Sequence, residues 1–163
     1  MTAPQAVANP LATEIVKKLK RKKSTLAIAE SITGGLLAGA LTDVSGSSAV
    51  FLGGVVSYSE AAKKSLLHVP QRILTKHTAV SEEVALIMAR SVRELFGAHY
   101  AISTTGVAGP GKAYGLRAGT AWLAIVTPHH EETVALALSG NRAEIRHATI
   151  ESALAAFARI LSS

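Results

Sequence analysis

The spacing of apolar positions changes several times along the chain, from a helical period to short continuous runs and back. Segment 11–22 has apolar residues at the three- and four-residue spacing of one helix face, and the run Leu26 to Ala29 is typical of a short buried strand. Segment 36–44 again favours a helix. We expect further strands over 51–58, 100–103, 120–126 and 133–138, and further helices over 60–67, 81–97 and 141–161.

Polar and small residues mark the ends of these elements. Ser59, Ser81 and Asn141 stand where a helix N-cap is expected, and Gly97 stands where a helix would end. Segment 104–111 is too rich in glycine for a helix and is predicted to be a loop. The turn Pro128 to His130 separates the last two strands, which indicates an antiparallel pair.

The alternation of strands and helices predicts an α/β fold of three layers. We expect a mixed, mostly parallel sheet with helices on both faces and a C-terminal antiparallel hairpin. Ligands of such folds bind beyond the carboxyl ends of the parallel strands. Ser31, Tyr58 and Thr105 each follow a predicted strand, so three hydroxyls should meet at one edge, although serine and threonine also occur there simply as turn residues.

Composition indicates one domain over residues 1–163, with a flexible start at 1–10. The chain has no cysteine, which excludes thiolate catalysis and a disulfide framework and favours a cytoplasmic location. We find neither a signal-peptide pattern nor an apolar run of about 20 residues. Nothing in the sequence therefore predicts a membrane partner.

The net charge of +6 comes from one short segment. Six of the 17 basic residues lie between Lys17 and Lys23, and the remaining chain is neutral. Nucleic-acid sites spread their cations over a face or interleave them with aromatics. Cations at a helix C-terminus are instead typical of a solvated helix end, so we do not expect nucleic acid as a partner.

Candidate chemistry comes from two serine-containing turns followed by a tyrosine and a lysine. These are Ala29 to Gly35, Ser45 to Ser48, Tyr58 and Lys63. Because a serine hydroxyl needs a neighbouring base, and a buried lysine is one of the few alternatives to histidine, the grouping indicates a hydrolase. A metal site is not expected, since the adjacent His129 and His130 would point to opposite sides of an extended chain.

Several blocks of the chain together resemble one family, the nicotinamide-nucleotide amidases formed by the carboxy-terminal domain of competence/damage-inducible protein A. The resemblance covers about residues 11–160. Its blocks are Ala29 to Gly35, Gly46 to Phe51, Gly53 to Ser59 with Lys63, Ala79 to Glu82, Gly106 to Pro110, Gly119-Thr120 with Trp122, and Gly140 to Arg142.

The resemblance implies hydrolysis of nicotinamide mononucleotide to nicotinate mononucleotide and ammonia, without a cofactor, in pyridine nucleotide salvage. It also implies that Ser48 is the nucleophile and Lys63 its base. Ser31, Tyr58, Thr105, Gly106 and an arginine, either Arg142 or Arg146, would contact the substrate, and Tyr58 would also take part in catalysis. We expect the chain to form a homo-oligomer.

The geometry of the predicted elements leaves the nucleophile open. A strand over 51–58 would be about 26 Å long, and a helix would bring Lys63 back by only about 6 Å. Ser48 and Lys63 of one chain would then lie at opposite edges. Either the strand is shorter or bent at Gly53-Gly54, or a second subunit completes the site, or Ser31 is the nucleophile.

Segment 111–118 departs from the family's usual loop, which ends in Lys-Pro-Val before the Gly-Thr pair. This chain has Gly111 to Ala118 without that proline. Lys112 and Arg117 remain as cations that could meet a phosphate. The departure keeps a second interpretation open, a catalytically inactive nucleotide-binding module of the same fold.

Overall fold

The computed structural model describes residues 7–163, and its sheet has five strands in the order β2-β1-β3-β4-β5. The strands are β1 (Leu26–Glu30), β2 (Phe51–Val56), β3 (Tyr100–Gly106), β4 (Thr120–Val126) and β5 (Glu131–Ala137). Both β2 and β3 pair with β1 in parallel, whereas β4 is antiparallel to β3 and to β5. The mixed sheet and the C-terminal hairpin are therefore confirmed.

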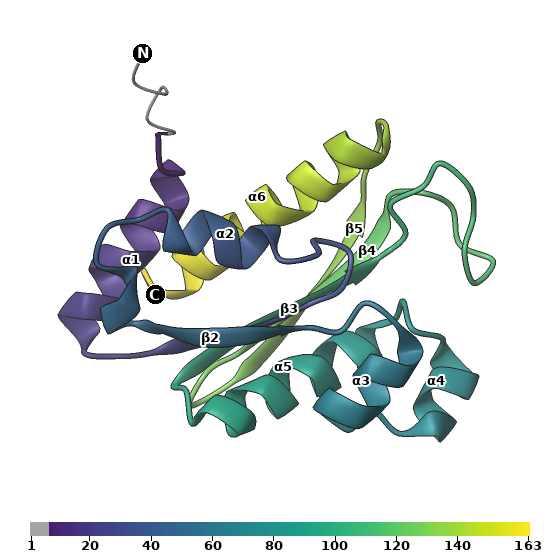
Figure 1. Ribbon diagram of the computed structural model, residues 1–163, viewed down its shortest axis with the longest axis horizontal. Coiled ribbons are helices and arrows are strands. Elements are labelled where there is room, and N and C mark those ends of the chain that lie inside the picture. Colours follow the sequence, from purple (N-terminus) through teal and green to yellow (C-terminus); the bar gives the residue numbers. More distant parts are fainter. Residues whose placement is uncertain (1–6) are drawn as a thin grey trace, which may run out of the picture.

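Helices cover both faces of this sheet, as Figure 1 shows. On one face lie α1 (Pro10–Lys22), α2 (Leu36–Thr42) and α6 (Arg142–Ile160); on the other lie α3 (Glu60–Leu67), α4 (Gln71–His77) and α5 (Glu82–Phe96). A short 3-10 turn, η1 (Ser47–Ala49), precedes β2. Two apolar cores result, one beneath α1, α2 and α6 and the other beneath α5.

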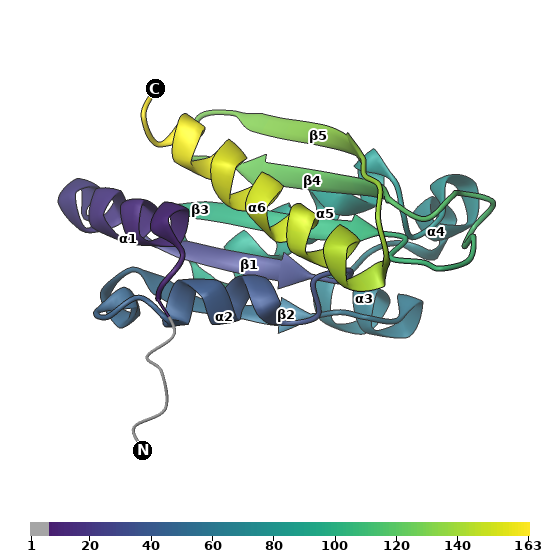
Figure 2. The same ribbon diagram turned by 90° about the horizontal axis from the view of Figure 1, so that it is seen from above.

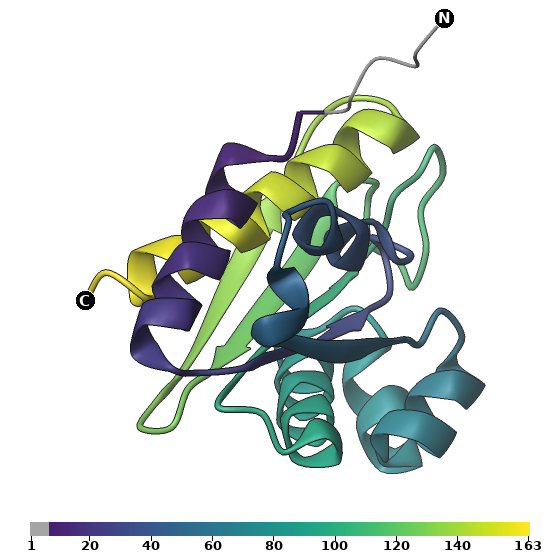
Figure 3. The same ribbon diagram turned by 60° about the vertical axis from the view of Figure 1, so that its left-hand side comes forward.

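The first core is centred on α6, which crosses the sheet diagonally and lies beside α1 (Figures 2 and 3). Phe157 of α6 is fully buried and packs edge-on against Tyr100 of β3, with ring centroids 5.5 Å apart. Asn141 and Glu144 form a reciprocal capping box at the start of α6. This cap fixes the amino end of the helix at the carboxyl edge of the sheet (Figure 2).

Most predicted boundaries are close to the observed ones, and the three predicted N-caps are confirmed. Two predictions were wrong. β2 ends at Val56 and not at Tyr58, because the chain turns there toward the cap of α3. Residues 104–106, which we expected to be a loop, continue β3 because β4 supplies an antiparallel partner for each of them.

The expected flexible start at residues 1–10 falls partly on residues 1–6, which lie outside the described residues. From residue 7 onward, Asn9 caps α1 by accepting hydrogen bonds from Leu11 and Ala12. Among residues 7–163, no helix combines the length and the apolar character that crossing a membrane requires.

Candidate active site

A cavity of about 400 Å³ opens at the carboxyl edge of the three parallel strands. Its wall takes residues from five regions that are far apart in sequence: the turn after β1, the start of α3, the link between α4 and α5, the segment that begins at the end of β3, and the start of α6. Ser31, Tyr58, Thr105, Gly106 and Arg142 all line it. The prediction that hydroxyls from distant positions meet at this edge is confirmed.

The centre of the cavity is a contact between Ser31 and Lys63. The Lys63 ammonium nitrogen lies 2.8 Å from the Ser31 hydroxyl oxygen and 2.8 Å from the carbonyl oxygen of Ser57. Lys63 is only 2% exposed, and Ser31 is 8% exposed. The pair is thus largely shielded from bulk water by the protein itself.

The position of Lys63 follows from the face of α3 on which it lies. Ser59 caps the helix by accepting a hydrogen bond from the Ala62 amide at 3.1 Å, and Lys63 shares the inner face with Leu67, one turn later. Lys64, about 100° further around the helix, is exposed. A single step along α3 therefore separates a buried amine from an ordinary solvated one.

Burial lowers the pKa of Lys63 to about 8, while the negative charge of Glu60 acts in the opposite direction. The main cause is desolvation, which penalises the charged ammonium form. At a pH near 8 a large fraction of Lys63 is a neutral amine, whose lone pair can accept the proton of Ser31. This fulfils the requirement that a lysine base must have a depressed pKa.

The turn that carries Ser31 is held by a buried carboxylate. Glu30, the last residue of β1, is 0% exposed and accepts hydrogen bonds from the amides of Gly35, Leu37 and Ala38 at 3.1, 3.0 and 2.9 Å. These amides belong to the first turn of α2, which has no intrahelical partners for them. The carboxylate therefore attaches α2 to β1 and closes the turn 31–35 between them.

Two backbone amides in this turn have no acceptor within the described part of the chain: those of Ile32 and Thr33. Ile32 directly follows Ser31 and lines the cavity. An amide placed directly after a nucleophilic serine is a common donor to the negative oxygen that forms when an acyl group is attacked. The turn thus supplies both a nucleophile and candidate oxyanion donors.

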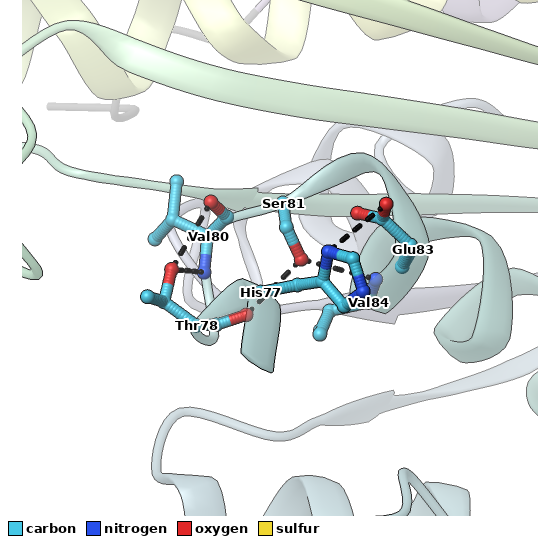
Figure 4. A network of polar contacts seen from close by, with 6 residues as sticks. All are labelled: His77, Thr78, Val80, Ser81, Glu83 and Val84. Atoms are coloured by element: carbon cyan, nitrogen blue, oxygen red, sulfur yellow. Dashed lines mark hydrogen bonds and ion pairs between the residues drawn. The ribbon is translucent and has the colours of Figure 1, made fainter. Parts of the chain in front are cut away.

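The opposite wall of the cavity comes from the link between α4 and α5, shown in Figure 4. Ser81 caps α5 by accepting from the Val84 amide at 3.3 Å and donates to the Thr78 carbonyl at 3.0 Å. A ring nitrogen of His77 lies 3.1 Å from the Glu83 carboxylate and adds a polar contact across the same link. Ala79 and Val80, which line the cavity, are therefore held between two anchored helix ends.

Thr105 fastens this wall to the sheet. Its hydroxyl donates to the carbonyl of Ala79 at 2.7 Å, so it is occupied even though the residue lines the cavity. Gly106 is required for close packing, because a Cβ there would lie 2.7 Å from both Ile32 and Ala121 side-chain carbons. Both residues shape the cavity in this structure.

Cations and aromatics surround the mouth of the cavity. Arg142, at the start of α6, donates to the Tyr58 hydroxyl and to the Gly109 carbonyl, both at 2.8 Å. Lys112 and Tyr114, from the segment that departs from the family pattern, line the same opening. Burial raises the pKa of Tyr114, and the Glu60 carboxylate beside it adds to the rise, so this segment lies against the start of α3.

Ser48 does not belong to this cavity. It is exposed on η1, before β2, whereas Lys63 lies after the end of β2. The six residues of β2 cover about 20 Å, so the shorter strand still separates the two residues. Ser48 and Lys63 of one chain therefore lie apart, as the strand geometry indicated, because parallel pairing with β1 aligns β2 so that only its carboxyl end faces Ser31.

Of the two candidate arginines, Arg142 lines the cavity and Arg146 does not. The Arg146 guanidinium instead donates to the carbonyls of Ile32 and Thr33. Sequence reasoning missed the roles of Glu30 and Tyr114. The sequence signal for Glu30 was its position: an acidic residue at the end of an apolar strand, directly before the turn that leads into a helix whose first amides need acceptors.

No group of three or more histidine or acidic side chains within residues 7–163 could hold a metal ion. The geometry instead defines a class: an α/β domain with a serine and a buried amine paired in a cavity at the carboxyl edge of a mixed sheet. Residues 8–161 match the family described as CinA C-terminal domain, and the chain belongs to this family.

Relatives agree with this assignment. A CinA-like protein of Frankia casuarinae is 45% identical over 88% of the chain, and one of Desulfotalea psychrophila is 44% identical over 88%. The matched region is 33% and 35% of the length of these two relatives, so the chain spans about a third of them.

Solved structures are similar over almost the whole chain. The competence damage-inducible protein A of Klebsiella pneumoniae gives a TM-score of 0.91 at 35% identity, covering 93% of this chain and 95% of that one. A competence/damage inducible protein of Agrobacterium tumefaciens gives 0.87 at 33%, covering 97% and 99%. The α/β fold is therefore shared across the family.

Proposed function

We propose that this chain is an amidohydrolase that converts nicotinamide mononucleotide to nicotinate mononucleotide and ammonia. The observation that carries the proposal is the Ser31–Lys63 contact of 2.8 Å inside a cavity. The substrate comes from the resemblance of the sequence blocks to nicotinamide-nucleotide amidases. In this proposal Ser31, and not Ser48, is the nucleophile.

The reaction uses the neutral form of Lys63. The amine takes the proton of the Ser31 hydroxyl while the oxygen attacks the carboxamide carbon, and the carbonyl oxygen becomes negative. The amides of Ile32 and Thr33 are the candidate donors to that oxygen. When the carbon–nitrogen bond breaks, Lys63 returns its proton to the leaving nitrogen, ammonia departs and an ester on Ser31 remains.

Water completes the cycle by the same route. Lys63 takes a proton from a water molecule, which attacks the ester carbon, and the Ser31 oxygen leaves as a hydroxyl after regaining that proton. One water is consumed and one carboxylic acid is released. The carbonyl of Ser57, which accepts from Lys63 at 2.8 Å, keeps the amine in place while its other positions exchange protons.

The size and charge of the cavity suit a mononucleotide. Its volume of about 400 Å³ lies within the usual range for small-molecule sites, roughly 300–1,000 Å³. The phosphate would meet Arg142 and Lys112 at the mouth, and a guanidinium can bind phosphate oxygens in pairs. The carboxamide would then lie deeper, toward Ser31.

Release of ammonia from nicotinamide mononucleotide by the purified chain tests the proposal directly. We expect turnover that rises with pH through about 8, following the pKa of Lys63. The departure in segment 111–118 favours one other outcome, a binding module. Binding of the nucleotide without ammonia release over pH 6–10 would overturn the amidase proposal in favour of that function.

A further inference from the structure

Two arginines lie one helical turn apart near the start of α6 and have different surroundings. Arg142 is exposed and reaches the cavity mouth. Arg146 is half-buried, and its guanidinium donates to the Ile32 carbonyl at 3.1 Å and to the Thr33 carbonyl at 3.2 Å. The second arginine therefore connects α6 to the turn that carries Ser31, more than 110 residues earlier in the sequence.

The fit between Arg146 and the turn is close. Gly34 has a φ of +58°, and a Cβ there would lie 3.1 Å from the guanidinium nitrogen of Arg146. A side chain at position 34 would thus crowd the arginine and would be strained in this backbone conformation. The glycine leaves room for the guanidinium to reach both carbonyls.

Fixing these carbonyls also fixes the direction of the neighbouring amides. In a planar trans peptide the C=O and the N–H point in opposite directions. Holding the Ile32 carbonyl toward Arg146 therefore directs the Thr33 amide away from α6. Likewise, the Ser31 carbonyl accepts from the Gly34 amide at 3.1 Å, which sets the direction of the Ile32 amide.

We propose that Arg146 is a positioning residue that orients the Ile32 and Thr33 amides as donors to the developing oxyanion. The inference rests on the proposed amidase function. Arg146 acts on the reaction through the backbone and not by touching substrate, while Glu30 fastens the following amides of the same segment from the side of β1. Arg146 thus holds the carbonyls of the turn, and Glu30 holds the amides at its end.

Kinetics separate this role from phosphate recognition. We expect Arg146→Met, which keeps most of the side-chain length but removes all donors, to lower kcat by about 10²-fold with little change in KM. The loss should be equal for nicotinamide mononucleotide and nicotinamide riboside, since the riboside has no phosphate. Arg146→Lys should recover part of kcat because a cationic donor nitrogen remains, although it lacks the fork geometry of the guanidinium.

The matched control is Arg159→Met, on the exposed outer end of the same helix, which should leave kcat unchanged. A rise in KM for the nucleotide alone in Arg146→Met would overturn the inference, because that result would mean that Arg146 binds the phosphate of the substrate. Equal losses in Arg159→Met would also overturn it, since they would mean a general effect on α6.

Hydrogen exchange of the full chain gives a test that does not depend on the activity. We expect the peptide covering residues 31–36 to exchange faster in Arg146→Met than in Arg159→Met and wild type, with α5 unchanged. Unchanged exchange over 31–36 would overturn the positioning role. If the wild type releases no ammonia while this exchange difference is present, the amidase proposal fails and the clamp on the turn stands.

Discussion

Two serine turns lie at opposite ends of the same pair of parallel strands, and only one of them has the surroundings of a nucleophile. Ser31 follows β1, is buried, and contacts the Lys63 amine. Ser48 precedes β2, is exposed, and makes no hydrogen bond through its hydroxyl to any described residue. In sequence both turns combine glycine with serine, so the difference arises only from the end of the strand at which each lies.

The two ends differ because of how parallel strands are connected. The carboxyl ends of β1, β2 and β3 lead into α2, α3 and the β3–β4 link, which begin at the same edge of the sheet (Figures 1 and 2). The cavity lies at this edge. At the amino end, the Ser48 turn lies beside α1, and the side chain of Lys20 packs against Gly46. Cations there remain solvated, whereas the cation at the carboxyl end is buried and has a lowered pKa.

The largest effect expected concerns the two serines themselves. Ser31→Ala should lower kcat by about 10⁴-fold or more, because the residual rate then comes only from binding and the oxyanion donors. Ser48→Ala should leave ammonia release close to wild type. A large loss in Ser48→Ala would break the comparison and would mean that Ser48 enters the site of a second copy, which a measurement of molar mass in solution would then have to reveal.

The second effect concerns the two adjacent lysines. Lys63→Met should lower kcat by roughly 10³-fold through loss of the base, while Lys64→Met should change it little. In the wild type, the acid limb of the kcat/KM profile should bend near pH 8, where Lys63 becomes neutral. Similar losses in both variants would indicate a general charge effect and not proton transfer.

The same buried amine should appear in the stability of the fold. Because the folded pKa of about 8 lies below the unfolded value of 10.5, the penalty of burying a charged Lys63 is complete below pH 8. It disappears as the pH rises from 8 to 10.5, where only the unfolded chain still binds the proton. The free energy of unfolding should therefore rise by about 3 kcal/mol over this window relative to Lys63→Met.

Denaturant unfolding of both proteins at pH 7 to 11 measures this difference. Other titrating groups contribute equally to wild type and variant and cancel in the subtraction. A flat difference across the window would mean that Lys63 keeps its ordinary pKa in the folded protein. The Ser31 turn would then have no better base than the Ser48 turn, which has only solvated lysines nearby.

Sequence patterns predicted the fold well because each element is encoded locally. The caps at Ser59, Ser81 and Asn141 and the alternation of apolar runs depend on neighbouring residues, and the layering of helices on a mixed sheet follows from strand–helix alternation. The continuation of β3 to Gly106 was missed because its antiparallel partner in β4 decides it. Glycine content had suggested a loop there, but tertiary pairing overrode that preference.

The sequence predicted which residues would gather at the site, but not which of them would contact each other. Ser31, Lys63, Tyr58 and Arg142 were correctly expected to contribute to one region, but the partner of Lys63 depends on the register between β1 and β2, which no local pattern contains. Arg142 and Arg146 look equivalent in sequence, one turn apart. Their contacts differ because only Arg146 faces the Ile32 and Thr33 carbonyls.

The smallest effect expected concerns Arg142 and sharpens the contrast between a cation at the cavity mouth and a cation at the other end of the sheet. Arg142 joins Tyr58 and the Gly109 carbonyl at the cavity mouth, whereas Lys20, the lysine beside the Ser48 turn, lies on α1 at the other end of the sheet. Arg142→Met should raise KM for nicotinamide mononucleotide by about 10- to 100-fold, the value of a charged hydrogen-bond pair. It should barely alter hydrolysis of nicotinamide riboside, which lacks the phosphate.

Steady-state kinetics on both substrates measure this effect of Arg142→Met. The matched control is Lys20→Met, which removes a cation at the other end of the sheet. If both substrates lose equally in Arg142→Met, the guanidinium supports Tyr58 and the loop at Gly109, and phosphate recognition must come from Lys112.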